Sequence, residues 1–179
     1  MKAALSDYRP ELAAEWSDEN GELTPDQVSY GSNRKVWWKG RCGHEWEASI
    51  KNRMNGAGCP YCSGHKLLKG FNDLASGNPV LAKEWSERNQ KHPDEVMAGS
   101  PAKAFWKCRI CGGEWEARIA DRVAGSGCPV CSFARIQPGI NDYATWYPDL
   151  ATEWSKKNGD LKPDAISAKA TINAWWKCR

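Results

Sequence analysis

Cys108-Arg109-Ile110-Cys111 and Cys128-Pro129-Val130-Cys131 are two Cys-x2-Cys pairs separated by sixteen residues. Each pair lets the chain bend so that both sulfurs reach one ion, and two pairs at this separation are typical of a tetrahedral four-thiolate zinc site. A cluster of reduced, buried cysteines is the alternative. We predict that Cys108, Cys111, Cys128 and Cys131 together hold one structural zinc ion.

A second, altered ligand set occurs earlier in the chain, at Cys42, Cys59 and Cys62. Three thiolates need a fourth ligand, and two histidines compete for that place. His44 lies two residues after Cys42, on the same side of a strand, and His65 lies three residues after Cys62. We favour His44, because Cys3His is a standard class of structural zinc site. The catalytic alternative would be three cysteines with an open water position, but the sequence places no general base beside them. We therefore expect two structural Zn2+ ions per chain.

An internal repeat of 69 residues relates these two ligand sets. Trp16, Trp85 and Trp154 follow one another at this interval, and Cys59 and Cys62 are 69 residues from Cys128 and Cys131. We therefore expect two complete units and an incomplete third, which stops after its first strand. Their ranges are residues 5–73, 74–142 and 143–179.

The units share one pattern of predicted elements. Each opens with Pro-x-Leu-Ala-x-Glu-Trp-Ser, beginning at Pro10, Pro79 and Pro148. Its apolar spacing predicts a helix of two to three turns that ends near Asn20, Asn89 and Asn158. An aromatic strand follows, and in the two complete units an alternating strand at residues 45–50 and 114–119 forms a hairpin with it. The predicted fold is therefore small α+β: tandem zinc modules, each with a hairpin and short helices.

The composition agrees with small, metal-stabilised modules. Leu, Ile, Val and Phe make up only 25 of 179 residues, whereas there are eleven Trp and eight Cys. A chain so poor in aliphatic residues needs a metal or disulfides for stability. No apolar run has the length of a signal peptide or a membrane span, so we expect an intracellular, cytoplasmic protein with reduced thiols. We expect the Trp residues of the small cores to be Trp16, Trp46, Trp85, Trp115 and Trp154.

The run Trp37-Trp38-Lys39, with Gly43-His44-Glu45-Trp46 and Gly58-Cys59-Pro60-Tyr61-Cys62 after it, resembles a family of tandem zinc-binding repeats of the zinc-ribbon or treble-clef type. The resemblance covers essentially the whole chain. It implies ligand roles for the four cysteines of the second unit and for His44, Cys59 and Cys62 in the first. Gly40 stands where the family has its first Cys, and Cys42 lies two positions later. Members of that family sometimes accompany nuclease domains.

Basic residues concentrate at the predicted zinc modules. Residues 33–66 carry seven Lys or Arg against two acids, whereas residues 5–32 carry one against seven. Such local patches can contact phosphates even though the net charge is only +3. Alternatively, Arg53 and Arg122 could pair with Glu15, Glu84 or Glu153, or pack over Trp rings. The candidate nucleic-acid contacts are Lys39, Arg41, Arg53, Lys66, Lys107, Arg109, Arg122 and Arg135.

These features predict a zinc-dependent, non-catalytic module that binds nucleic acid, with DNA favoured, for recognition or targeting. A protein-interaction scaffold that uses exposed Trp side chains is the alternative, and an accessory fragment of a nuclease-associated protein is a third possibility. No small-molecule substrate is expected, because no paired carboxylates, Cys-His dyad or phosphate loop occurs outside the zinc motifs. No membrane partner is expected either, because no apolar run is long enough to span a membrane. Cys178 aligns with Cys108 but precedes no second pair. It is either a free thiol or the edge of a longer protein, and we expect the second.

Overall fold

The computed structural model describes residues 3–178, and the chain divides between Asn72 and Asp73 into two compact units. The first unit contains the first repeat. The second contains the second repeat together with the shorter third. Among the described residues, no helix is both long enough and apolar enough to cross a membrane.

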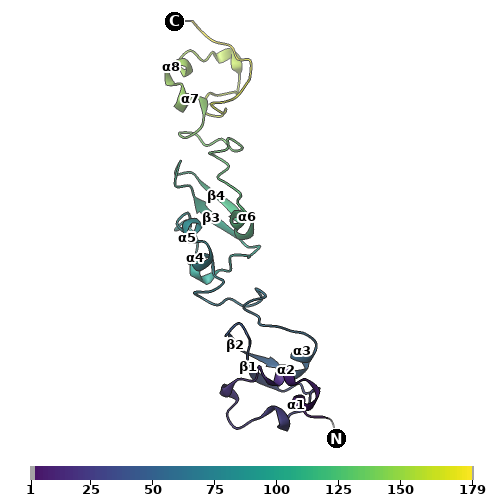
Figure 1. The fold of residues 1–179 in the computed structure, drawn as a ribbon. Helices are drawn as coiled ribbons and strands as arrows, with labels where there is room; N and C mark the ends of the chain where they lie inside the picture. The colour runs from purple at the N-terminus through teal and green to yellow at the C-terminus, as the bar shows by residue number, and fades with distance from the viewer. Residues whose placement is uncertain (1–2, 179) are drawn as a thin grey trace. The chain divides into compact units, whose positions relative to one another are not determined.

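The two complete repeats have the same order of elements: short helices, a two-stranded antiparallel hairpin, and one more short helix (Figure 1). Those of the first repeat are α1 (Leu5–Tyr8), α2 (Pro10–Ala13), η1 (Asp18–Asn20), η2 (Pro25–Gln27), β1 (Lys35–Lys39), β2 (Glu45–Ser49) and α3 (Ile50–Met54). Those of the second are α4 (Leu74–Gly77), α5 (Pro79–Ala82), η3 (Pro93–Glu95), β3 (Lys103–Lys107), β4 (Glu114–Arg118) and α6 (Ile119–Val123).

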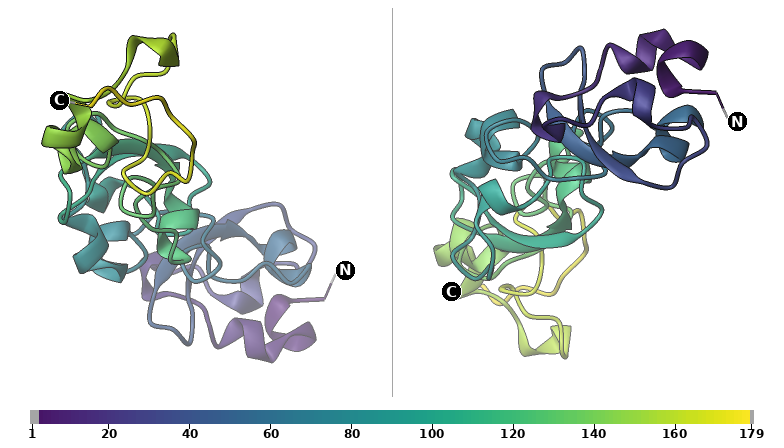
Figure 2. Two further views of the ribbon diagram at one scale, coloured as in Figure 1. Left: turned by 90° about the horizontal axis from the view of Figure 1, so that it is seen from above. Right: turned by 90° about the horizontal axis from the view of Figure 1, so that it is seen from below.

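The third repeat contains only the opening elements of this pattern. They are α7 (Tyr143–Trp146), α8 (Pro148–Ala151) and η4 (Lys156–Asn158). In Figure 2 the yellow-green and yellow part of the chain, which is the third repeat, has no strand arrows, whereas each complete repeat shows its hairpin. The aromatic segment that corresponds to β1 and β3 makes one isolated bridge, between Trp154 and Trp176.

The hairpins confirm the predicted strand pairs and place equivalent residues opposite each other. Trp38 faces Trp46 in β1–β2, and Trp106 faces Trp115 in β3–β4. The prediction extended the second strand by one residue, because Ile50 and Ile119 already belong to α3 and α6. A two-stranded hairpin alone is marginally stable in water, so each hairpin depends on the elements packed around it.

The predicted long helix of each repeat is wrong in its extent, since α2, α5 and α8 have four residues each. The backbone after α2 leaves the helix to run beside β1 as a short edge segment. There the Ser17 amide donates to the Trp37 carbonyl (3.2 Å), and the Lys39 amide donates to the Glu15 carbonyl (2.7 Å). Pairing with the strand therefore replaces further helical turns.

An asparagine side chain continues this edge pairing in all three repeats. The Asn20 side chain donates from Nδ2 to the Trp37 carbonyl (2.7 Å) and accepts from the Trp37 amide at Oδ1 (2.8 Å). Asn89 makes the same pair of bonds with Phe105, and Asn158 with Trp175. Asn20 and Asn158 end the 3-10 helices η1 and η4, close to the predicted helix ends, and all three asparagines also act as side-chain substitutes for one residue of a neighbouring strand.

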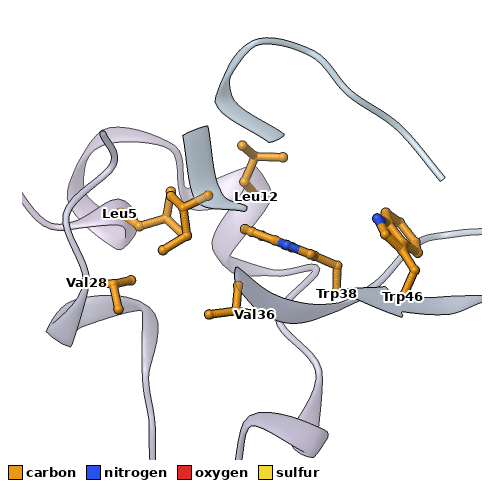
Figure 3. Packing of buried hydrophobic residues seen from close by; sticks show 7 residues of the cluster. Leu5, Leu12, Val28, Val36, Trp38 and Trp46 are labelled. Carbon is orange, nitrogen blue, oxygen red and sulfur yellow. The ribbon is translucent and has the colours of Figure 1, made fainter. Parts of the chain in front are cut away.

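A Trp pair forms the centre of each small core. In the first repeat the Trp38 ring lies across the middle of the cluster, between the aliphatic side chains and Trp46 (Figure 3). Trp38 and Trp106 have no exposed surface, although the set of Trp residues expected in the core did not include them. Trp46 and Trp115 are buried as predicted. Trp16, Trp85 and Trp154 are only partly buried, because they pack edge-to-face on the outside of this pair.

The third repeat shows what the second half of a module contributes. Trp154 and Trp176 keep the edge-to-face geometry, with ring centroids 5.0 Å apart. Trp176 is nevertheless 44% exposed, whereas its equivalents Trp38 and Trp106 are fully buried. The hairpin's second strand and the following helix are what cover this ring in the complete repeats.

A buried arginine completes the core of each full repeat. The Arg53 guanidinium pairs with Glu15 and donates to the Ala57 carbonyl, and Arg122 pairs with Glu84 and donates to the Ser126 carbonyl. Each arginine also lies over both Trp rings of its hairpin, with its Cζ atom 5.0 to 5.3 Å from the ring centroids.

The prediction that Arg53 and Arg122 contact nucleic acid is therefore corrected. Their side chains are only 6% and 7% exposed, and their charge is already paired. The structure supports the alternative interpretation, in which these residues bind Glu15 and Glu84 and pack over Trp rings.

We expect Arg122→Ala to destabilise the second repeat by about 3 kcal/mol, because it leaves Glu84 without its buried partner and opens space between two Trp rings. Native-state hydrogen exchange of the β3 and β4 amides measures this local stability, with the β1 and β2 amides as an internal reference.

Arg118→Ala is the matched control, since Arg118 forms an exposed pair with Asp121 in the same repeat. Removing an exposed pair should change the stability by less than about 1 kcal/mol. Equal effects of the two substitutions would show that burial of Arg122 adds nothing.

Candidate metal centres

The second repeat brings all four of its predicted zinc ligands together. Cys108 and Cys111 lie in the β3–β4 turn, and Cys128 and Cys131 lie in the loop after α6. The four sulfurs lie within 4.8 Å of one another, with Cys108 Sγ 3.6 Å from Cys131 Sγ and Cys111 Sγ 3.7 Å from Cys128 Sγ. Tetrahedral Zn2+ with bonds of about 2.3 Å requires sulfurs about 3.8 Å apart, so the cluster fits the ion.

The β3–β4 turn and the equivalent β1–β2 turn, which carry the first ligands of each site, are the zinc knuckles. The backbone of the β3–β4 knuckle is arranged to stabilise thiolates. The Ile110 amide points to Cys108 Sγ at 3.4 Å, and the Gly113 amide points to Cys111 Sγ at 3.4 Å. Gly112, at a φ of +71°, makes the turn between these amides, a conformation that side chains rarely adopt. Backbone donors aimed at sulfur favour the charged form that binds a metal.

The first repeat gathers Cys42, His44, Cys59 and Cys62, whose ligand atoms also lie within 4.8 Å of one another. His44 Nδ1 lies 3.5 Å from the sulfurs of both Cys59 and Cys62. This spacing suits a tetrahedral ion with Zn–N near 2.0 Å and Zn–S near 2.3 Å. The histidine takes the fourth position, so the cluster is a closed Cys3His set rather than an open, catalytic-looking one.

His65, the competing candidate, lies outside this cluster. Its Nδ1 is 2.8 Å from Ser63 Oγ, and its side chain is exposed. The His44 ring is instead held by aromatic neighbours that the sequence did not single out: its centroid lies 4.3 Å from that of Phe71 and 5.6 Å from that of Tyr61. Such contacts orient a ligand ring before the metal binds.

The two knuckles have exchanged a ligand and a glycine. The Gly40 amide bonds to the His44 carbonyl just as the Cys108 amide bonds to the Gly113 carbonyl, so Gly40 matches Cys108 and His44 matches Gly113. A Cβ at Gly40 would lie 2.9 Å from the Trp46 ring and 3.2 Å from Cys42 Sγ. The tighter turn of the first repeat has no room for a ligand there and takes it from the other end of the turn.

A side chain at Gly113 would also be crowded, although its nearest neighbour is the movable end of the Gln137 side chain. A Cβ at this position would lie 2.9 Å from Gln137 Oε1 and 3.3 Å from Cys111 Sγ. Each repeat therefore has one position for the variable ligand and a glycine at the other.

The thiols of each cluster perturb one another. Desolvation and the neighbouring thiols of Cys42 and Cys59 raise the pKa of Cys62 to about 11. Burial would raise the pKa of Cys108 too, but hydrogen bonds from backbone amides and from Cys131 and Cys111 outweigh it and lower the pKa to about 7. Each cluster holds protons that a metal must displace, so zinc binding is coupled to proton release.

The sequence pattern of the family described as "Probable Treble clef zinc finger domain" matches residues 12–65 and again residues 81–133. The two matches cover more than half of the chain, which therefore belongs to this family. No curated protein matches the chain significantly. The family, the two clusters and the small α+β fold agree on two structural zinc ions, held by Cys42, His44, Cys59 and Cys62 and by Cys108, Cys111, Cys128 and Cys131.

The remaining candidate residues lie around these clusters. Six of the eight predicted nucleic-acid contacts are exposed: Lys39, Arg41, Lys66, Lys107, Arg109 and Arg135. Lys39 forms an exposed pair with Glu45 (3.2 Å). Cys178 is exposed and, within residues 3–178, belongs to no group of metal ligands.

Metal analysis of the purified chain should find two zinc ions per molecule. Because the ligands are joined only through the ion, a strong chelator should remove both and unfold the hairpins, which near-UV circular dichroism of the Trp residues would report. One zinc per chain, or hairpins that survive chelation, would contradict two structural sites.

His44→Ala should weaken zinc binding by the first repeat and spare the second, since it removes one of four ligands. Zinc release to a competing chelator, followed as fast and slow fractions, measures the two sites separately. The matched control is His65→Ala, which should leave both fractions unchanged. Fast release from His65→Ala would transfer the ligand role to that residue.

Proposed function

We propose that this chain is a zinc-stabilised module that binds nucleic acid, with DNA as its partner, for recognition or targeting. The observation that carries the proposal is the exposed pair of cations in each zinc knuckle, Lys39 with Arg41 and Lys107 with Arg109. Lys39 and Lys107 end the strands β1 and β3, and Arg41 and Arg109 lie on the turns that follow, so zinc bound at these turns would fix the cations in place. Lys66 and Arg135 add one exposed cation beside the second half of each site.

Such contacts would be made to phosphates. Lys and Arg side chains that neutralise backbone phosphates give affinity and orientation but little base preference. We propose a binding role rather than a catalytic one, because both clusters already supply four protein ligands and so leave no position for substrate. A cytoplasmic location and association with a nuclease are part of the same proposal.

A protein-interaction scaffold is the second candidate. Trp37, Trp146 and Trp175 are 41%, 48% and 63% exposed, an unusual number of accessible Trp side chains for a chain of this size. Exposed Trp residues are frequent anchors in protein interfaces. Binding of this kind would depend little on salt, which separates it from phosphate binding.

We expect the chain to bind labelled duplex DNA with an affinity that falls steeply between about 50 and about 200 mM salt, because counterions are released from each neutralised phosphate. Lys39→Ala with Lys107→Ala should weaken binding and reduce the salt dependence. Fluorescence anisotropy with duplex DNA, single-stranded DNA and RNA of one sequence measures both quantities.

The control is Lys35→Ala with Lys103→Ala, which removes the same number of lysines from the far ends of the same strands, β1 and β3. This variant should bind as the unaltered chain does. Absence of salt-dependent binding to all three nucleic acids would overturn the proposal and favour the scaffold.

A further inference from the structure

A cleft in the second repeat gathers more cations than the zinc knuckle alone supplies. It has a volume of about 530 Å³. Lys107 and Arg109 of the knuckle line it together with Lys83 and Arg88 of the edge segment, and these four cations outnumber the two acids in its lining, Glu87 and Glu114. All four side chains belong to exposed residues.

The edge pairing described above brings these two groups together. The Lys107 amide bonds to the Glu84 carbonyl (2.7 Å), and the Ser86 amide bonds to the Phe105 carbonyl (3.1 Å). Lys83 comes directly before this paired segment, and Arg88 follows it after one residue, Glu87. Backbone hydrogen bonds therefore fix their positions relative to Lys107.

Arg88 is also held in place by its side chain. Its Cζ atom lies 4.1 Å from the centroid of the Phe105 ring, and its Nη1 atom lies 3.7 Å from Glu114 Oε2. Glu114 accepts a further hydrogen bond from Ser86 Oγ (3.0 Å). A guanidinium stacked on a ring is pre-oriented and retains donors for an oxygen anion.

The first repeat has the same backbone here but opposite charge. The amide of the third residue bonds to the serine hydroxyl at 3.2 Å in both cases, from Glu19 to Ser17 and from Arg88 to Ser86. At the positions of Lys83 and Arg88 the first repeat has Ala14 and Glu19.

The third repeat resembles the second in the position of its cations. Lys157 stands at the position of Arg88, and its Nζ atom lies 5.2 Å from the centroid of the Trp175 ring, which stands at the position of Phe105. The preceding residue is Lys156, where the first two repeats have Asp18 and Glu87. Lys177 takes the place of Lys107.

Balancing the charge of a zinc–thiolate site does not account for this pattern. Cys108 lines the cleft, and four thiolates carry more charge than one Zn2+ neutralises, so cations are favourable there. Within its described part, however, the third repeat holds no group of metal ligands and still has Lys156 and Lys157 beside an exposed Trp. The shared feature of the two repeats is a cation over an aromatic ring at the surface.

We propose that nucleic acid is bound mainly by the second and third repeats, with a backbone phosphate in the cleft between Lys83, Arg88, Lys107 and Arg109, and that the first repeat, with Ala14 and Glu19 at the matching positions, offers only its knuckle cations. This inference rests on the proposed function and names the part of the chain that performs it. The aromatic ring beside each cation offers a surface on which a base or sugar can pack.

The two repeats provide the experiment. Lys83→Ala with Arg88→Glu gives the second repeat the residues that the first carries at the same backbone positions. In the full chain, with zinc bound, this variant should bind a labelled 20-base-pair duplex at least about tenfold more weakly and lower the salt slope by about two. Lys157→Ala should weaken binding to a smaller degree.

The reciprocal variant, Ala14→Lys with Glu19→Arg, tests the first repeat and should strengthen binding by creating a second cleft of the same charge. The control Arg34→Ala with Lys35→Ala, which removes two exposed cations at the start of β1 in the first repeat, should change the affinity less than about twofold. Zinc content and chelator release should remain those of the unaltered chain in each variant.

The outcomes separate the two proposals. No binding by the unaltered chain would overturn the proposed function, and this inference with it. Binding that persists in Lys83→Ala with Arg88→Glu, or that is lost in Arg34→Ala with Lys35→Ala, would overturn only the assignment to the cleft. Weaker binding accompanied by loss of zinc from Lys83→Ala with Arg88→Glu would also overturn it, because the cations would then serve the metal site.

Discussion

A buried arginine–glutamate pair holds each complete repeat together. It connects the helix after the hairpin to the segment before it, and its guanidinium lies over both hairpin Trp rings. Burying a charge is costly unless it is paired and hydrogen-bonded, and both arginines pair and donate through their Nη atoms, whereas each buried Nε has no hydrogen-bond partner. The aromatic cores are too small to enclose themselves, so the positions of the hairpin Trp rings depend on this pair. The exposed Trp176 of the third repeat shows the arrangement without it.

The metal sites impose a second constraint, which acts on the turn rather than on the core. Four ligands must converge on one point, but the first knuckle is one residue shorter than the second. The shorter turn moves the ligand to its far end and substitutes imidazole for thiolate. Coordination number is thereby retained while the charge of the site changes, because a neutral histidine replaces an anionic sulfur. The repeats are thus equivalent in fold and different in electrostatics.

The repeat interval and the cysteine spacing predicted the fold, the hairpins and seven of the eight ligands, because these depend on local geometry. The sequence favoured His44 over His65 as the eighth ligand, and the structure confirms it. The shape of the turn and the position of Phe71, which hold this ring in place, could not be read from the sequence. The burial of Arg53 and Arg122 depends on partners 38 residues away, and the equal separation of Glu15–Arg53 and Glu84–Arg122 was the available signal. The helices α2, α5 and α8 proved short because the residues that follow them bond to the aromatic segment of the same repeat. Helical periodicity cannot reveal such a tertiary contact.

The asparagine side chains that bond to Trp37, Phe105 and Trp175 have a consequence for self-association. A strand with an open edge offers unpaired amides and carbonyls to any other chain, and arrays of short hairpins present many such edges. In every repeat the edge segment and one carboxamide occupy these groups on the outer side of the aromatic strand. A chain rich in surface Trp can therefore carry several hairpins in tandem while this edge of each remains closed to intermolecular β-pairing.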